Sequence, residues 1–134
     1  MTRRVTAIRI HCPVEAGTLA ALLGGDTAAA AAGDATLAAM MAVIRAHPVL
    51  GDFGVYQSVM ELAPGWEVFT PSPQATPTLG AAGATTISPT VIVKSYAAFD
   101  ADPAQLDAAL AAIMAAHPWE TPVVELVEAA LLTR

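Results

Sequence analysis

Apolar residues recur at every second position in some segments of this chain and at every third to fourth position in others. The first spacing is typical of strands with one buried face, and the second is typical of helices that bury one stripe. The main segments are, in order, a strand, a helix, two strands, a helix and a strand. The predicted main strands cover residues 5–12, 54–62, 90–96 and 123–127, and a further short strand covers 66–69. One main helix runs from its cap Asp34 to His47, and the other runs from its cap Asp102 to His117.

This order predicts a ferredoxin-like sandwich. Two strand–helix–strand units with right-handed crossovers place both helices on one face of an antiparallel sheet. A short helix from about Glu15, an Ala-rich insert at 26–33 and a hairpin that turns at Pro64-Gly65 add to this plan. We therefore expect an α+β fold of this type, built as a single domain over residues 1–134.

Residues 71–89 show no apolar period. This stretch is rich in Pro, Thr, Gly, Ala and Ser and contains no charged residue. Loops of this length inside a compact domain are usually functional or disordered. We expect an irregular, mobile loop here, in the middle of the chain.

The predicted strands carry apolar side chains on both faces. Val91 and Val93 alternate with Ile92 and Lys94, and the strand at 123–127 is similarly apolar on both sides. Since the helices cover only one face of the sheet, the other face would expose apolar surface to water. We therefore expect a homo-oligomer in which another copy of the chain covers that face.

The charge balance excludes some classes of partner. Twelve acidic residues against six basic ones give a formal charge of −6. Arg3, Arg4 and Arg9 lie within the first ten residues, but three arginines are too few for a nucleic-acid footprint. Nucleic acid and anionic membrane surfaces are therefore not expected as partners.

Cysteine usage bears on the cellular compartment. The single cysteine, Cys12, excludes an internal disulfide framework and agrees with a reducing environment. No apolar stretch long enough for the core of a signal peptide precedes His11. We expect a cytoplasmic protein in which Cys12 is a small core residue.

The segment His117-Pro118-Trp119-Glu120-Thr121-Pro122 is the most distinctive motif. With the strand at 123–127, it resembles the His-Pro-Tyr-Glu-x-Pro segment of CutA-like proteins and of the insert domain of the YqfO-type family. The surroundings of Tyr56 and Phe69 also resemble the YqfO-type insert, so the resemblance covers about half of the chain.

The resemblance implies the PII/CutA-like superfamily, which forms trimers with the sheets facing the threefold core. CutA-like members are linked with divalent-cation tolerance, and PII-like relatives bind nucleotides or small metabolites between subunits. By this resemblance Trp119, Glu120 and Tyr56 are the candidate ligand-binding residues. The uncharged loop at 71–89 argues against binding of nucleotide phosphates there.

His117 and Glu120 are the candidate metal ligands. An imidazole and a carboxylate could bind a divalent ion such as copper or zinc at a subunit boundary, if another chain contributed further ligands. A structural role is the alternative, because a histidine at the end of a helix interacts favourably with the helix dipole and the following proline ends the helix. The pair His47-Pro48 occupies the same place in the first half of the chain.

Two functional hypotheses remain open. The first is a non-catalytic trimeric protein that binds or senses a small molecule or a divalent metal. The second is a small enzyme of the dimeric α+β-barrel kind, with a pocket between helices and sheet. No histidine has a partner at a spacing that indicates a catalytic triad, which favours the first hypothesis.

Overall fold

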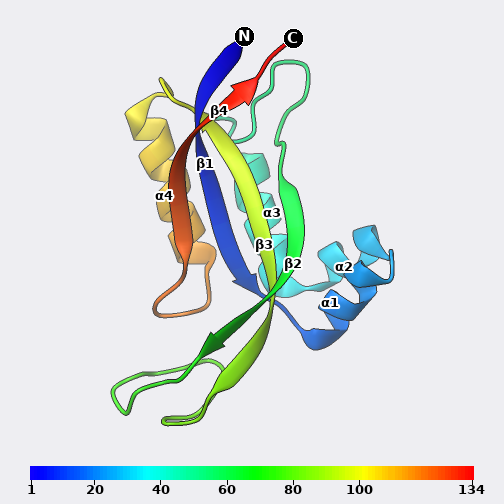
Figure 1. The fold of residues 1–134 in the computed structure, drawn as a ribbon, viewed down its shortest axis with the longest axis vertical. Coiled ribbons are helices and arrows are strands. Elements are labelled where there is room, and N and C mark those ends of the chain that lie inside the picture. The colour runs from blue at the N-terminus through cyan, green and yellow to red at the C-terminus, as the bar shows by residue number, and fades with distance from the viewer.

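Four antiparallel strands form one sheet with helices against one face in a computed structural model, which describes residues 1–134 (Figure 1). The order across the sheet is β2-β3-β1-β4, and each neighbouring pair is antiparallel. This order confirms the predicted ferredoxin-like α+β fold. The strands are β1 (Thr2–Pro13), β2 (Glu61–Phe69), β3 (Thr86–Ala98) and β4 (Val124–Leu132), and the helices are α1 (Ala16–Leu23), α2 (Thr27–Gly33), α3 (Ala35–Ala46) and α4 (Pro103–Ala116).

The core lies between the sheet and the helices α3 and α4, which lie on the same side of the strands (Figure 1). Alternate residues of the central strands β1 and β3 point into it, and α3 and α4 contribute one stripe each. The fully buried apolar residues of this cluster include Ile8, Ile10, Val93, Leu37, Met40, Ile44 and Ile113.

Both predicted helix caps are present. The Asp34 Oδ1 accepts a hydrogen bond from the Leu37 backbone N–H at 3.0 Å, and the Asp102 Oδ2 accepts one from the Gln105 N–H at 3.1 Å. Each cap satisfies one of the N–H groups that a helix leaves without a partner in its first turn. Pro103 occupies the first turn of α4, where its missing N–H costs nothing.

The Ala-rich insert forms the short helix α2, which packs beside α1 at one end of the sheet (Figure 1). Leu19 of α1 and Ala31 of α2 are the buried residues of these helices, so this pair adds little to the core. None of the helices is by itself both long and apolar enough to cross a membrane. Only α2 and α3 together, bent by 96°, reach such a length and composition.

The predicted strand at 54–62 and the hairpin turn at Pro64-Gly65 are wrong. Residues 51–60 are irregular, and β2 runs without interruption from Glu61 through Pro64-Gly65 to Phe69. An edge strand tolerates proline because one of its sides makes no ladder hydrogen bonds. The hairpin is instead formed by β2 and β3, with residues 70–85 as its loop.

The long loop is shorter than the predicted range of 71–89, because residues 86–89 belong to β3. Ile87 pairs with Val68, and Pro89 pairs with Trp66. Pairing of β3 with β1 extends only to Thr90, so Pro89 lies where β3 has β2 as its sole neighbour and the cost of a proline is low. The β2–β3 hairpin therefore extends past the end of β1 as an arm (Figure 1).

A row of charged side chains crosses the face of the sheet that α3 and α4 leave open. Glu61, Lys94, Arg9 and Glu125 are aligned by the strand register. Arg9 lies 3.3 Å from Glu125, and Lys94 lies 3.9 Å from Glu61. The prediction of a substantially apolar second face is therefore wrong for the middle of the sheet. Alternation within one strand shows which side chains share a face, but only the register shows which of them align.

The irregular segment before β2 is attached to the sheet through Gly51. Its N–H donates to the Tyr96 carbonyl at 2.7 Å, and its own carbonyl accepts from the Val59 N–H at 3.0 Å. Gly51 has φ of +68°, and a Cβ at this position would collide with the Val59 backbone. Phe53, which follows, packs edge-on against the Tyr96 ring at 5.7 Å between centroids.

We predict that Gly51→Ala lowers the free energy of unfolding by about 2 kcal/mol or more, since it adds a backbone collision to a left-handed conformation. Gly54→Ala is the matched control, because Gly54 also has positive φ but nothing lies near its Cβ position. The control should lose only about 1 kcal/mol. Urea denaturation measures both values, and equal losses would contradict the proposed role of the collision.

Candidate functional site

A hollow of about 460 Å³ opens at the end of the sheet where β1 finishes, opposite the two chain termini (Figure 1). Its walls come from the starts of α1 and α3, from the loop of the β2–β3 hairpin, from β3 and from the segment after α4. These elements contribute, among others, Glu15, Asp34, Leu79, Pro89 and Trp119. A volume of this size is in the usual range for small-molecule sites.

Asp34 joins the two helix starts that line the hollow. Besides capping α3, its Oδ2 accepts hydrogen bonds from the Glu15 N–H at 3.0 Å and from the Thr18 hydroxyl at 2.9 Å. Burial alone would raise the pKa of Asp34, but the hydrogen bonds from Leu37, Glu15 and Thr18 outweigh burial and lower this pKa. Asp34 is therefore an ionised structural residue at neutral pH, with both oxygens engaged.

Trp119 and Glu120 attach the segment after α4 to the hairpin. The Trp119 ring packs edge-on against Phe69 at 5.2 Å between centroids, and the Glu120 Oε1 accepts from the Thr76 N–H at 2.7 Å. A second hollow of about 170 Å³, which Glu120 lines, shares Thr78, Leu79 and Trp119 with the first. Two of the predicted ligand-binding residues therefore border the same hollowed region.

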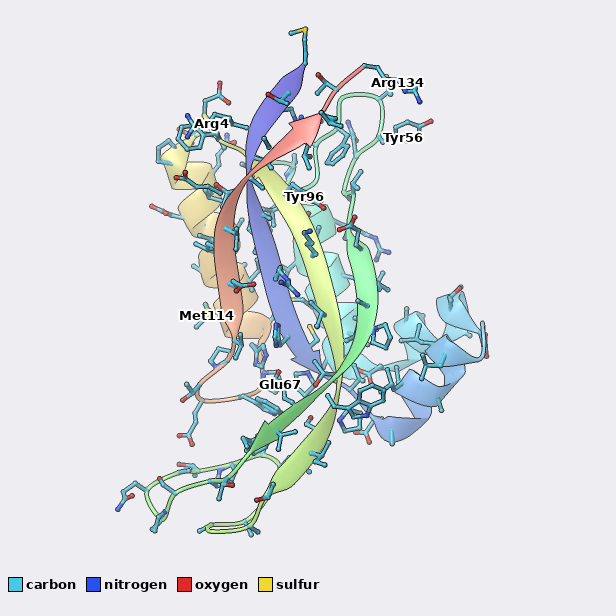
Figure 2. The ribbon with its side chains drawn as sticks, in the orientation of Figure 1. Arg4, Tyr56, Glu67, Tyr96, Met114 and Arg134 are labelled. Carbon is cyan, nitrogen blue, oxygen red and sulfur yellow. The ribbon has the colours of Figure 1, made fainter.

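Tyr56, the third predicted ligand-binding residue, lies far from the other two. Figure 2 shows it at the end of the molecule that holds the termini, near Arg134. Its side chain is exposed, and the segment around it is irregular. The structure therefore does not bring Tyr56 together with Trp119 and Glu120.

His117 is buried, and both of its ring nitrogens are engaged within the chain. Nδ1 accepts the Trp119 backbone N–H at 3.2 Å, so Nε2 carries the hydrogen and donates to the His11 carbonyl at 2.7 Å. These bonds hold the segment after α4 against the end of β1. His47 differs from His117, because its Nδ1 bonds the Val43 carbonyl of its own helix at 2.7 Å.

Metal ligation by His117 and Glu120 would require one of these contacts to break. Glu120 is bonded to the loop, and His117 has no free nitrogen. No group of three His, Cys, Asp or Glu side chains in the chain is arranged to hold a metal ion. Metal binding at these two residues stays a prediction.

A half-buried carboxylate, Glu67 (labelled in Figure 2), lies beside His11 in the same region. Its Oε1 lies 3.6 Å from the His11 Nδ1 and has no hydrogen-bond partner. Burial raises the pKa of Glu67, and this effect outweighs the opposing influence of His11 and His117. Sequence reasoning missed this pair, because Glu67 is remote from both histidines in sequence and only the strand pairing brings them together.

Cys12 is fully buried on the helix side of β1. Burial, with smaller contributions from the Asp34 and Glu67 carboxylates, raises the pKa of the Cys12 thiol to about 12. The side chain is therefore a neutral thiol at physiological pH and an unreactive nucleophile. The predicted role of Cys12 as a small core residue is confirmed.

Comparison with known proteins identifies the fold. No family model and no curated protein matches the chain. Among solved structures, it is similar to a Bacillus cereus protein related to NIF3, with a TM-score of 0.61 and 12% identity. The match covers 96% of this chain and 26% of that one, so this chain spans about a quarter of the neighbour's length. The CutA-like and YqfO-type resemblance stays a prediction beyond this shared fold.

We predict that Glu67→Gln stabilises the protein at neutral pH. The raised pKa means that ionisation of Glu67 costs more in the folded than in the unfolded state, so stability is lost as pH rises through the folded-state pKa. Removing the charge should raise the melting temperature at pH 8 by about 3 °C, the shift that about 1 kcal/mol gives in a domain of this size. The gain should shrink toward pH 4.

Glu125→Gln is the control for this measurement, because Glu125 is an exposed carboxylate beside Arg9. Its effect on stability should stay within about 0.5 kcal/mol at pH 8. The melting temperatures of both variants are measured between pH 4 and pH 8. If Glu67→Gln raises the melting temperature as much at pH 4 as at pH 8, the charge of the Glu67 carboxylate is not the cause of the gain.

Proposed function

We propose that this chain is a non-catalytic, oligomeric binding module that holds a small molecule in the hollow beside Trp119. The hollow itself carries the proposal: about 460 Å³ of space lined by apolar side chains, an indole ring and a few polar groups. This combination is typical of small-molecule sites. Trp119 borders both hollows, so its ring would contact an occupant of either.

The lining supports binding more than catalysis. Its two carboxylates are Asp34 and Glu15, and the oxygens of Asp34 are already bonded to the two helix starts. A general base needs a free lone pair within reach of the substrate proton, which Glu15 alone of the two retains. The lining holds no histidine, cysteine, lysine or tyrosine that could work with Glu15 as an acid or a nucleophile. Between the sheet and the helices α3 and α4 the space is filled by the apolar core. The hollow of about 150 Å³ between α1 and the strands β2 and β3 has no titratable side chain in its lining, so no observation favours the alternative enzyme with a pocket in that layer.

The arm formed by the β2–β3 hairpin supports the oligomer. Trp66, Val68 and Ile87 lie on one face of this arm and are each about 60% exposed. Large apolar side chains gathered on one surface mark an interaction site. Ile87 also lines the hollow, so a second copy seated on the arm would border the ligand. We propose a trimer, the assembly that the family resemblance implies.

A divalent cation remains the other candidate ligand. Zinc or copper at His117 and Glu120 would displace one of the two hydrogen bonds of the His117 ring and would need further ligands from another copy. Stabilisation of the protein by Zn²⁺ or Cu²⁺ that disappears in His117→Ala would support this version. An identical shift in both proteins would exclude His117 as a ligand.

We predict that small molecules found by a thermal-shift screen bind at Trp119. Trp119→Ala should weaken their binding at least about tenfold, because it removes a stacking surface from the shared wall of both hollows. Tyr56→Ala is the control, since Tyr56 is an exposed aromatic residue at the opposite end of the molecule. Titration calorimetry measures the affinities. Equal losses in both variants, or none in Trp119→Ala, would place the ligand elsewhere.

We predict a trimer in solution that Trp66→Glu dissociates, because a charge on the arm must lose its hydration in the interface. Met114→Glu alters a half-exposed side chain on α4, away from the arm, and should leave the trimer intact (Figure 2). Light scattering coupled to size-exclusion chromatography measures the masses. A monomeric wild-type protein would overturn the assembly and with it any site completed by a partner.

A further inference from the structure

We propose that the ligand of the hollow is a small organic cation, an amine or amidine group on an apolar body. This inference rests on the proposed small-molecule function and specifies the chemistry of the same site. Three observations support it: the acidic side chains that line the hollow, the Asp34 carboxylate that occupies the N-terminus of α3 in its wall, and the Trp119 ring.

The charged side chains that line the hollowed region are all acidic. Glu15 and Asp34 line the larger hollow, and Glu120 lines the smaller one. Neither lining contains Lys, Arg or His. A carboxylate close to a bound cation in a partly desolvated site forms a strong, charge-assisted interaction, whereas an anion there would be repelled.

The arginines and the lysine of the chain line neither hollow. Arg3 and Arg4 are near the start of β1, whereas the hollow opens at its end. Arg9 and Lys94 lie on the open face of the sheet, where each has a glutamate partner. With a formal charge of −6 over the whole chain, the long-range field also favours a cation.

The start of α3 does not offer the anion site that a helix N-terminus usually provides. Such sites arise from free backbone N–H groups and the positive end of the helix dipole. Here the ionised Asp34 side chain occupies that position and accepts the Leu37 and Glu15 N–H groups. A phosphate or carboxylate ligand would therefore meet a fixed negative charge where it needs donors.

The remaining walls suit the apolar body of such a ligand. Pro13, Pro89 and Pro118 present rigid apolar surfaces, and Trp119 presents an indole ring. Indole is the aromatic side chain that attracts cations most strongly through its electron-rich face. A cation with an aromatic or alkyl body therefore finds carboxylates, an aromatic ring and apolar contact in one hollow.

Three probes of nearly the same shape test the sign of the charge: benzamidine, which is a cation, benzamide, which is neutral, and benzoate, which is an anion. Titration calorimetry on the full chain gives the affinities, and the indole N–H signals of Trp119 and Trp66 in an NMR spectrum locate the contact. We expect benzamidine to bind at least about tenfold more tightly than benzamide, benzoate not to bind, and only the Trp119 signal to shift.

Two variants identify the carboxylate that contributes. Glu15 is exposed and its side chain makes no hydrogen bond that the fold requires, so Glu15→Gln should fold normally. It should weaken benzamidine about threefold to tenfold and leave benzamide unchanged. The control is Glu128→Gln. Glu128 is an exposed glutamate on β4 that lies beside Arg4 of β1, and its replacement should alter neither affinity.

The outcomes separate this inference from the function on which it rests. If benzamide or benzoate binds as tightly as benzamidine and shifts the Trp119 signal, the cation preference is wrong and the binding module stands. If Glu15→Gln and Trp119→Ala each bind benzamidine as tightly as the wild-type protein does, the cation site is not in this hollow. If none of the probes binds, the cation inference fails. The proposed function is then tested separately, by whether the thermal-shift screen finds a small molecule whose binding depends on Trp119.

Discussion

The structure depends on the pairing of β1 with a strand on each side. Residues 5–13 of β1 pair with β3, and residues 2–10 pair with β4. This central position gives every residue of the strand a defined face. Ile8 and Ile10 lie in the core beneath the helices, while Arg9 lies in the charged row on the open face. Where β1 ends at Pro13, the layered core also ends, and the hollow opens.

Two side chains connect this end of the sheet to the segments around it. The Asp34 carboxylate holds the starts of α1 and α3 together, and the His117 ring joins the His11 carbonyl to the Trp119 N–H. Both residues are polar and buried, and both have their hydrogen-bonding groups satisfied, which is the usual condition for burying such groups. They position the walls of the hollow, and neither has an atom left for chemistry on a ligand.

Glu67 is the exception in this region, because its buried Oε1 has no hydrogen-bond partner. A buried acceptor without a partner costs stability, and such a cost is often found beside functional sites. Glu67 lies next to His11 and on the arm strand that continues toward Phe69 and the loop. Glu67 therefore lies toward the same end of the molecule as Glu15, Asp34 and Glu120, but it lines neither hollow.

The sequence by itself determined the order of elements, the caps at Asp34 and Asp102 and the burial of Cys12, because these features follow from local periodicity and from side chains near their own backbone. It also marked Trp119 and Glu120 by resemblance. Only the tertiary structure decided that β2 passes through Pro64-Gly65, that Arg9, Lys94, Glu61 and Glu125 form one row, and that Glu67 meets His11. These features depend on which strands pair and in which register, and register is set by contacts between segments far apart in the chain.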